Sequence, residues 1–233
     1  MRRLELSPRL QTVADLVRPG ARLADVGTDH AYLPAALLLE GRIPFAIAAD
    51  LGQGPLERAR ATVREYGLTG KAAFRLCDGL RGIRPDEVDA IAIAGMGGET
   101  IAAILEAAPW TREGDVPLIL QPMSSMPDLR KWLGENGYHI EEERLAREGA
   151  VIYTVLSVRA GEMPPATPAE LWAGKNNGSP LRGAWLDRWL ARTRRALDGM
   201  AQAQEEDVPR RRELEEVFSG LTEMKKEWEQ WQM

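Results

Sequence analysis

The sequence predicts an α/β fold, in which a mostly parallel, doubly wound sheet is followed by a hairpin of two α-helices. Over residues 1–160, short apolar runs alternate with amphipathic stretches, as in strands joined by crossover helices. Residues 161–180 are rich in Pro, Gly and Asn, which is typical of a linker or irregular segment. Two long amphipathic stretches then fill residues 181–233. We therefore expect a sheet domain, a linker and a helical hairpin with these bounds.

Five apolar runs predict the parallel strands. They lack the alternation of a half-exposed strand, so we expect them to be buried on both faces of the sheet. The runs cover residues 21–27, 44–51, 72–80, 88–98 and 116–123. Residues 141–161 do alternate and contain a turn near Gly149, which predicts two antiparallel strands at the end of the sheet.

Amphipathic stretches before and between these strands predict the helices. The first places Leu10, Val13 and Val17 on one helical face, at spacings of three and four. The predicted helices of the sheet domain cover residues 6–17, 31–41, 54–67, 99–110 and 126–138. Two more are expected over residues 181–206 and 210–231, and their Trp and Leu stripes predict that they pack against each other.

Composition argues against several classes of protein. The net charge is −5, so no global excess of positive charge marks a nucleic-acid binder. The single cysteine, Cys77, excludes an internal disulfide and is interpreted as a buried structural thiol. His30 and His139 lie far apart and no cysteine pair exists, so we expect no metal site. Without a run of roughly 20 apolar residues or an apolar signal core, we expect a cytoplasmic protein with no membrane partner.

An aspartate ends each of the first three predicted strands, where ligands of doubly wound sheets bind. Asp25 can accept hydrogen bonds from a ligand amine, Asp50 can accept from two ribose hydroxyls, and Asp78 can reach an adenine amino group. Gly27 and Gly79, close behind, leave room for the backbone or a ring to approach. Three such acids predict a nucleoside cofactor. The alternative is a purely structural sheet in which the glycines only make turns.

The turn after the first strand indicates which cofactor binds. A dinucleotide site has Gly-x-Gly-x-x-Gly, whereas this turn reads Gly-Thr-Asp-His-Ala-Tyr, with Asp29 and Tyr32 in place of the later glycines. An anionic pyrophosphate would meet Asp29 unfavourably. S-adenosylmethionine has no phosphate and carries a sulfonium and an amino group, which acids attract. The turn therefore favours S-adenosylmethionine over a nicotinamide dinucleotide.

Five sequence blocks carry a family resemblance. They are DVGTDHAYLP from residue 25, AADLGQGPLERA from residue 48, CDGL from residue 77, IAGMGGETI from residue 93 and LILQPMSSMPDLRKWL from residue 118. In this order they resemble the bacterial tRNA adenine-N1 methyltransferases of the TrmK family, which modify adenine 22 in the D arm. The match covers residues 4 to about 160, and the C-terminal helices fit the family's coiled-coil domain more loosely. The resemblance implies a Rossmann-like class I S-adenosylmethionine-dependent methyltransferase sheet.

The resemblance also implies roles for individual residues. The cofactor-binding set is Asp25, Gly27, Asp50, Leu51, Asp78, Gly79 and Gly95. The catalytic residues at the transfer site are Asp29, His30 and Tyr32. The substrate-binding set on the sheet is Met96, Gly97, Gly98, Gln121 and Pro122. One departure is Met123, where the family tends to have Asn after Leu-Gln-Pro, so a polar contact near the base pocket is missing or supplied otherwise.

Methylation at adenine N1 asks little of an enzyme's acid and base groups, because the neutral base already carries a lone pair there. Catalysis is then mainly positioning. Asp29 could stabilise the cationic product or accept from the adenine amino group, and His30 and Tyr32 could stack on the base or hydrogen-bond to it. The alternatives are a capped surface histidine, a core tyrosine, and an Ala-Gly-Met-Gly-Gly turn that only shapes the pocket. No Asn-Pro-Pro-Tyr motif is present, which argues against N6 chemistry.

Arginines crowd the C-terminal helices and predict a surface for tRNA phosphates. In the first helix they are Arg182, Arg188, Arg192, Arg194 and Arg195, and Arg210, Arg211 and Arg212 open the second. We assign Arg188, Arg192 and Arg195 to substrate binding. The alternative is a solvated face balanced by the glutamates of the second helix. We expect a monomer, with a dimer left open.

Other functions stay open at this point. The same sheet could methylate a small molecule or a protein, in which case the helices would serve only for dimerisation. A non-catalytic S-adenosylmethionine-binding protein could use the helices to dock a partner, although a sensor would not need Asp29, His30 and Tyr32 beside the cofactor. A nicotinamide oxidoreductase is disfavoured by the interrupted glycine pattern.

Overall fold

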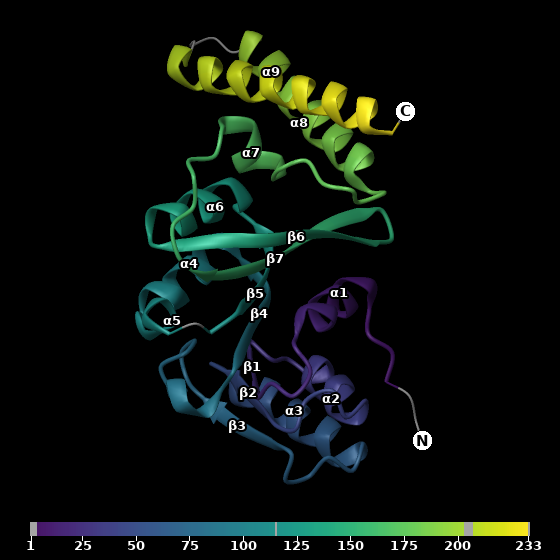
Figure 1. Ribbon diagram of the computed structural model, residues 1–233, viewed down its shortest axis with the longest axis vertical. Coiled ribbons are helices and arrows are strands. Elements are labelled where there is room, and N and C mark those ends of the chain that lie inside the picture. Colours follow the sequence, from purple (N-terminus) through teal and green to yellow (C-terminus); the bar gives the residue numbers. More distant parts are fainter. Residues whose placement is uncertain (1–3, 115, 203–206, 233) are drawn as a thin grey trace.

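The computed structural model describes residues 4–114, 116–202 and 207–232, and within them seven strands form one sheet (Figure 1). The strands are β1 (Leu23–Val26), β2 (Ala46–Asp50), β3 (Ala72–Leu76), β4 (Ala90–Gly97), β5 (Leu118–Ser124), β6 (Tyr138–Glu148) and β7 (Val151–Ala160). Their order is β3-β2-β1-β4-β5-β7-β6, with the first five parallel and the last two antiparallel. The predicted fold class and the two antiparallel strands at the end of the sheet are confirmed.

The helices flank this sheet and continue beyond it. They are α1 (Pro8–Leu16), α2 (Tyr32–Leu39), α3 (Gln53–Glu65), α4 (Gly98–Glu106), α5 (Trp110–Glu113), α6 (Met126–Glu135), α7 (Pro168–Ala173), α8 (Arg182–Ala201) and α9 (Val208–Trp231), with one 3₁₀ turn, η1 (Pro85–Glu87). Each predicted helix has a counterpart. The predicted end of the first C-terminal helix, residues 203–206, lies outside the described residues.

Two apolar cores cover the two faces of the sheet, because successive side chains of a strand point to opposite faces. Leu23 faces one core, with side chains from α1, α2 and α3. Ala24 and Val26 face the other, with side chains from α4 and α6. Every residue of β1 is buried, as the continuous apolar run predicted. Along β4 the residues of the carboxyl end are the ones that become exposed, so this end is where a ligand can approach the middle of the sheet.

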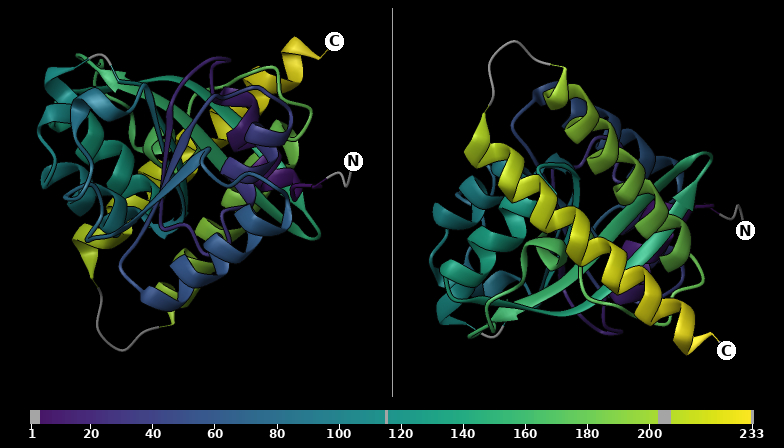
Figure 2. Two further views of the ribbon diagram at one scale, coloured as in Figure 1. Left: turned by 90° about the horizontal axis from the view of Figure 1, so that it is seen from below. Right: turned by 90° about the horizontal axis from the view of Figure 1, so that it is seen from above.

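A third apolar core joins the C-terminal helices to each other and to the sheet. Helices α8 and α9 run side by side as an antiparallel pair, as Figure 2 shows from above. Trp185, Leu186 and Trp189 of α8 pack with Val217 and Leu221 of α9, so the predicted stripes do meet. Short helix α7 lies within residues 161–180, the segment described as a linker from its composition, and its Ala169 and Ala173 belong to the same core.

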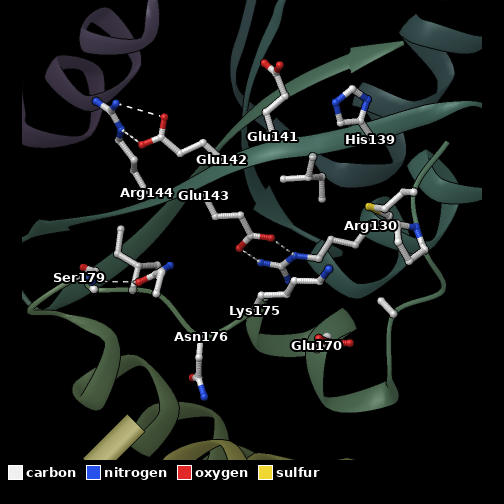
Figure 3. Close-up of a pocket in the computed structure, with 18 of the residues that line it drawn as sticks. Arg130, His139, Glu141, Glu142, Glu143, Arg144, Glu170, Lys175, Asn176 and Ser179 are labelled. Atoms are coloured by element: carbon white, nitrogen blue, oxygen red, sulfur yellow. Dashed lines mark hydrogen bonds and ion pairs between the residues drawn. The ribbon is translucent and has the colours of Figure 1, made fainter. Parts of the chain in front are cut away.

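A buried ion pair fixes α7 to the sheet (Figure 3). Arg130 of α6 is 2% exposed, and its guanidinium donates from Nε and Nη2 to the two carboxylate oxygens of Glu143 on β6, at 2.9 and 2.8 Å. Its Nη1 donates to the carbonyl oxygens of Leu171 and Trp172 in α7. The ion pair therefore connects helix α6 and strand β6 to helix α7 of the C-terminal part.

Arg182 corrects one prediction about the basic helix. Its side chain is fully buried and donates to the carbonyl oxygens of Ala173 and Gly174 and to Oδ1 of Asn176. Burial lowers the pKa of the guanidinium to about 10. Because Arg182 caps the end of α7 inside the fold, it has no exposed atom for a phosphate.

In the part of the chain that the structure describes, no helix is both long enough and apolar enough to cross a membrane.

Candidate active site

The order in which strands are added to the sheet reverses between β1 and β4. This switch point places a ligand site at the carboxyl ends of the two strands. Strand β1 pairs with β2 on one side and with β4 on the other, so the connections that follow β1 and β4 leave toward opposite edges. The turn after β1 begins at Gly27, which has a φ of +79° and donates its N–H to the carbonyl oxygen of Ala49. The side chain of Met96, from the end of β4, lies against this glycine.

Asp25 is a buried carboxylate without a compensating cation. It is 7% exposed at the end of β1, and no cationic side chain in the described residues forms an ion pair with it. Burial, together with the negative charge of Asp50, raises the pKa of the Asp25 carboxyl to about 6. At neutral pH the site therefore holds a desolvated negative charge. A cationic ligand group is the natural partner for it.

The next two strand ends carry the other predicted cofactor residues. The Asp50 carboxylate accepts one hydrogen bond from the N–H of Gly52 at 2.7 Å, which orients it and leaves its second oxygen for a ligand. Asp78 is exposed and lies 3.5 Å from the Arg81 guanidinium. Leu51 is 74% exposed and offers an apolar surface. The Cys77 thiol beside Asp78 is only partly buried, and burial raises its pKa.

The turn that follows Gly27 presents an acid and two aromatic rings. His30 and Tyr32 stack with ring centroids 5.0 Å apart and planes 6° from parallel, and Tyr32 is 43% exposed. The Asp29 carboxylate lies 3.4 Å from His30 Nε2 and accepts from Arg58 Nε at 2.9 Å. The three predicted catalytic residues are thus adjacent, and Arg58 of α3 joins them. Arg58 was missed because it lies 29 residues away in sequence.

A bulge in β4 shapes the opposite wall of the site. Pairing with β5 shifts register between Ala94 and Met96, and Gly95 takes a φ of +84°. The freed N–H of Gly95 donates to Oε1 of Gln121 at 3.1 Å, and Arg9 Nη1 from α1 donates to the same oxygen at 2.5 Å. Arg9 thereby positions Gln121, which positions the bulge. Sequence reasoning missed Arg9 because 112 residues separate it from Gln121.

Three substrate assignments change in the light of this geometry, and one of them is Pro122, which is buried within β5. Gln121 is fully buried and its amide nitrogen donates to the carbonyl oxygen of Pro122, so the expected direct contact with substrate has no exposed atom to make it. Gly98 is also buried, and a Cβ there would lie 2.6 Å from the carbonyl oxygen of Ser125. Gln121 and Gly98 support the site through packing. Met96 and Gly97, at the end of β4, remain partly exposed.

The basic residues of α8 divide into two groups. Arg188 and Arg192 line a cavity that also contains Pro122 and Met123, from the strand end beside Gly97. Arg195 lies outside this cavity and donates to the carbonyl oxygen of Ala191 in its own helix. The arginines that open α9 are partly neutralised, because Arg210 and Arg211 pair with glutamates one turn further on.

A larger cavity of about 670 Å³ lies elsewhere, between β6 and residues 162–179, and Figure 3 shows its lining. Its lining carries both signs of charge: the acids include Glu141, Glu142 and Glu143 on β6, and the cations are Arg130, Arg144 and Lys175. None of the strand-end residues lines it, so it is separate from the candidate site. Among the described residues, no group of three or more acidic, His or Cys side chains could hold a metal ion.

Comparisons with known proteins point to one chemistry. A family model described as a methyltransferase domain matches residues 6–156. The chain is 36% identical over 234 residues to the tRNA (adenine(22)-N(1))-methyltransferase of Bacillus subtilis, an alignment that covers 96% of this chain and 98% of that protein. It resembles a solved NADB-Rossmann superfamily protein of Streptococcus agalactiae, with a TM-score of 0.85, 37% identity and coverage of 95% and 98% of the two chains. It also resembles M. capricolum TrmK in complex with S-adenosyl-homocysteine, with a TM-score of 0.79, 27% identity and coverage of 94% and 96%.

Proposed function

The chain belongs to the tRNA (adenine22-N1)-methyltransferase family, and from this membership we propose that it methylates N1 of adenine 22 in the D arm of tRNA, with S-adenosylmethionine as the methyl donor. The observation that carries the proposal is the buried carboxylate of Asp25, placed at the switch point directly before the turn that presents Asp29, His30 and Tyr32. The tRNA partner, monomeric state and cytoplasmic location expected from the sequence belong to the same proposal.

The strand ends fit the cofactor group by group. S-adenosylmethionine, when bound, supplies an electrophilic methyl group on a sulfonium. The buried, unpaired Asp25 carboxylate would hold the ammonium of its methionine part. The free oxygen of Asp50 would accept from the ribose hydroxyls, and Asp78 with the neighbouring Gly79 would take the adenine ring. Leu51 and the Gly95 bulge would border these parts of the site.

The target base would then lie between the aromatic turn and the end of β4. Adenine N1 needs no general base, so the chain's task is to orient the ring. The exposed face of Tyr32, backed by His30, can stack against a base, an interaction worth about 1–3 kcal/mol. The Asp29 carboxylate can offset the positive charge that methylation leaves on the base. Arg58 holds that carboxylate in place, and His30 Nε2 lies 3.4 Å from it.

A labelling experiment tests the proposed function. The protein is incubated with methyl-labelled S-adenosylmethionine and an unmodified tRNA transcript, which is then digested to nucleosides. We expect label in 1-methyladenosine, and none when adenine 22 of the transcript is replaced. Label in another nucleoside, or label that persists after this replacement, would contradict the assignment. Cofactor binding without any labelled nucleoside would favour a small-molecule or protein substrate.

Replacing Arg9 tests whether the wall of the site is positioned from α1. We expect Arg9→Met to lower kcat for tRNA methylation about tenfold, because Gln121 loses a hydrogen bond from a charged donor, worth about 1.5–3 kcal/mol. The Kd for S-adenosylmethionine should rise by less than the methylation rate falls, because Arg9 supports the Gly95 bulge at the border of the cofactor site and contacts none of the strand-end acids.

The matched control is Arg18→Met, an exposed arginine just after the same helix. Steady-state kinetics and calorimetric cofactor binding measure both effects. An equal loss in Arg18→Met, or a loss of cofactor affinity that accounts for the lower rate, would show that Arg9 has no positioning role.

A further inference from the structure

A second cavity begins where the candidate transfer site ends. It has a volume of about 410 Å³ and lies between residues 122–128, the start of β7 and helix α8. Pro122 and Ser124, which line it, pair with Met96 and Gly97 of β4. The cavity therefore lies beside the strand end that carries the Gly95 bulge. Its volume falls within the roughly 300–1,000 Å³ of small-ligand pockets.

Two buried polar groups in its walls lack partners. Thr154 is 1% exposed and Trp189 is 8% exposed, and both line the cavity. Neither the hydroxyl of Thr154 nor Nε1 of Trp189 has a hydrogen-bond partner in the described protein. Unpartnered buried groups of this kind are rare and costly. Both atoms lie just below the cavity surface, so a ligand with a polar edge would reach them once a lining side chain moves aside; the indole donates and the hydroxyl donates or accepts.

The remaining lining combines aromatic rings with positive charge. Trp172 and Trp185 both pack edge-on against Trp189, at centroid distances of 5.2 and 5.4 Å, and all three rings line the cavity. Arg188 and Arg192 are exposed, form no ion pair with any described residue, and also line it. Among the described residues that line the cavity, Asp128 is the one acid. Flat rings, hydrogen-bonding groups and guanidinium groups together suit a base and its phosphate.

From this combination we propose that the cavity binds one nucleotide of the tRNA near the target adenine, with its base against the indoles and its phosphate at Arg188 and Arg192. The proposal rests on the proposed function, because it takes tRNA as the substrate. It gives α8 a specific task. The helix and the sheet would hold the same RNA strand on both sides of the reacting base, which would stabilise the opened conformation that methylation of a stacked adenine requires.

The first test removes the two cavity arginines that have no ion-pair partner; the third, Arg210, pairs with Glu213. We expect Arg188→Gln with Arg192→Gln to raise the Kd for tRNA about tenfold or more near 0.15 M salt, and to reduce the slope of log Kd against log salt by about 1 to 2. The matched control is Arg194→Gln with Arg212→Gln, which removes two exposed charges of α8 and α9 that do not line the cavity. An equal loss in both double variants would overturn the proposal in favour of a diffuse basic surface.

The second test removes a buried hydroxyl. Thr154→Val keeps the shape of the side chain, so we expect an unchanged or raised thermal midpoint, because an unpartnered polar group is lost. We expect KM for tRNA to rise about fivefold while the Kd for S-adenosylmethionine is unchanged. An unchanged KM, with wild-type methylation of adenine 22 intact, overturns the cavity proposal alone. Failure of the wild-type chain to bind or methylate tRNA overturns the proposed function as well.

Discussion

Asp25→Asn is expected to make the protein more stable without cofactor and much weaker in binding it. The buried carboxylate has a pKa of about 6 in the fold, against an ordinary value near 3.8. Each pKa unit corresponds to about 1.4 kcal/mol, so the charged form destabilises the fold by about 3 kcal/mol at pH 7. Asparagine removes that penalty. It also removes the negative charge that would pair with the ammonium of S-adenosylmethionine, so we expect the cofactor Kd to rise about 100-fold.

The direction of the pH dependence follows from the raised pKa. Between about pH 4 and pH 6 the folded protein binds more protons at Asp25 than the unfolded chain does, so its contribution lowers stability as pH rises. Above pH 6 the penalty is complete. Urea unfolding of the wild type and of Asp25→Asn over this range should therefore diverge as pH rises. Cofactor affinity should show the reverse dependence, weakening about tenfold per unit below pH 6 in the wild type only.

The matched control for this experiment is Asp198→Asn, which removes an exposed carboxylate from α8. We expect it to leave stability and cofactor binding within error of the wild type. A lower unfolding midpoint for Asp25→Asn would mean that the Asp25 charge is compensated within the fold. An unchanged cofactor Kd would mean that Asp25 does not contact the cofactor.

The sheet was predictable because burial on both faces leaves a direct trace in sequence. The run around Leu23–Val26 is apolar at almost every position, and the alternation around Val151–Ala160 marks a strand near the edge. Strand-end acids could be placed together for the same reason, since parallel strands end at one edge. Helix α7 was missed because its proline and glycine neighbours resemble a linker. Thr167 and Glu170 form a capping box that would have identified its start.

Contacts between distant segments could not be predicted from periodicity. Nothing in the spacing of Arg9 indicates Gln121, and nothing in the charge of Arg182 distinguishes it from Arg188. Arg182 and Arg188 lie on the same amphipathic helix, yet Arg182 is fully buried against α7 and Arg188 is exposed. Which guanidinium points inward depends on how α8 rests on α7. That orientation is a tertiary property which a single helical stripe does not specify.

The largest expected loss of stability comes from Arg130→Met. The substitution leaves the largely buried Glu143 carboxylate, 13% exposed, without its cation and frees two carbonyl oxygens of α7, so we expect the free energy of unfolding to fall by about 3 kcal/mol. Combining it with Glu143→Leu removes the stranded charge, and the double variant should recover to within about 2 kcal/mol of the wild type. Urea unfolding measures both. The control is Lys131→Met, at an exposed neighbouring position.

The same variants separate cofactor binding from attachment of the C-terminal helices. Arg130 holds α7, whereas Asp25 lies at the switch point between β1 and β4. In Arg130→Met we therefore expect faster amide exchange in α7 and α8 and weaker tRNA binding, while the Kd for S-adenosylmethionine stays within twofold. If cofactor affinity falls together with tRNA affinity, the sheet and the helices unfold as one cooperative unit. If the double variant loses as much stability as Arg130→Met alone, or more, the two side chains do not stabilise the fold as a pair.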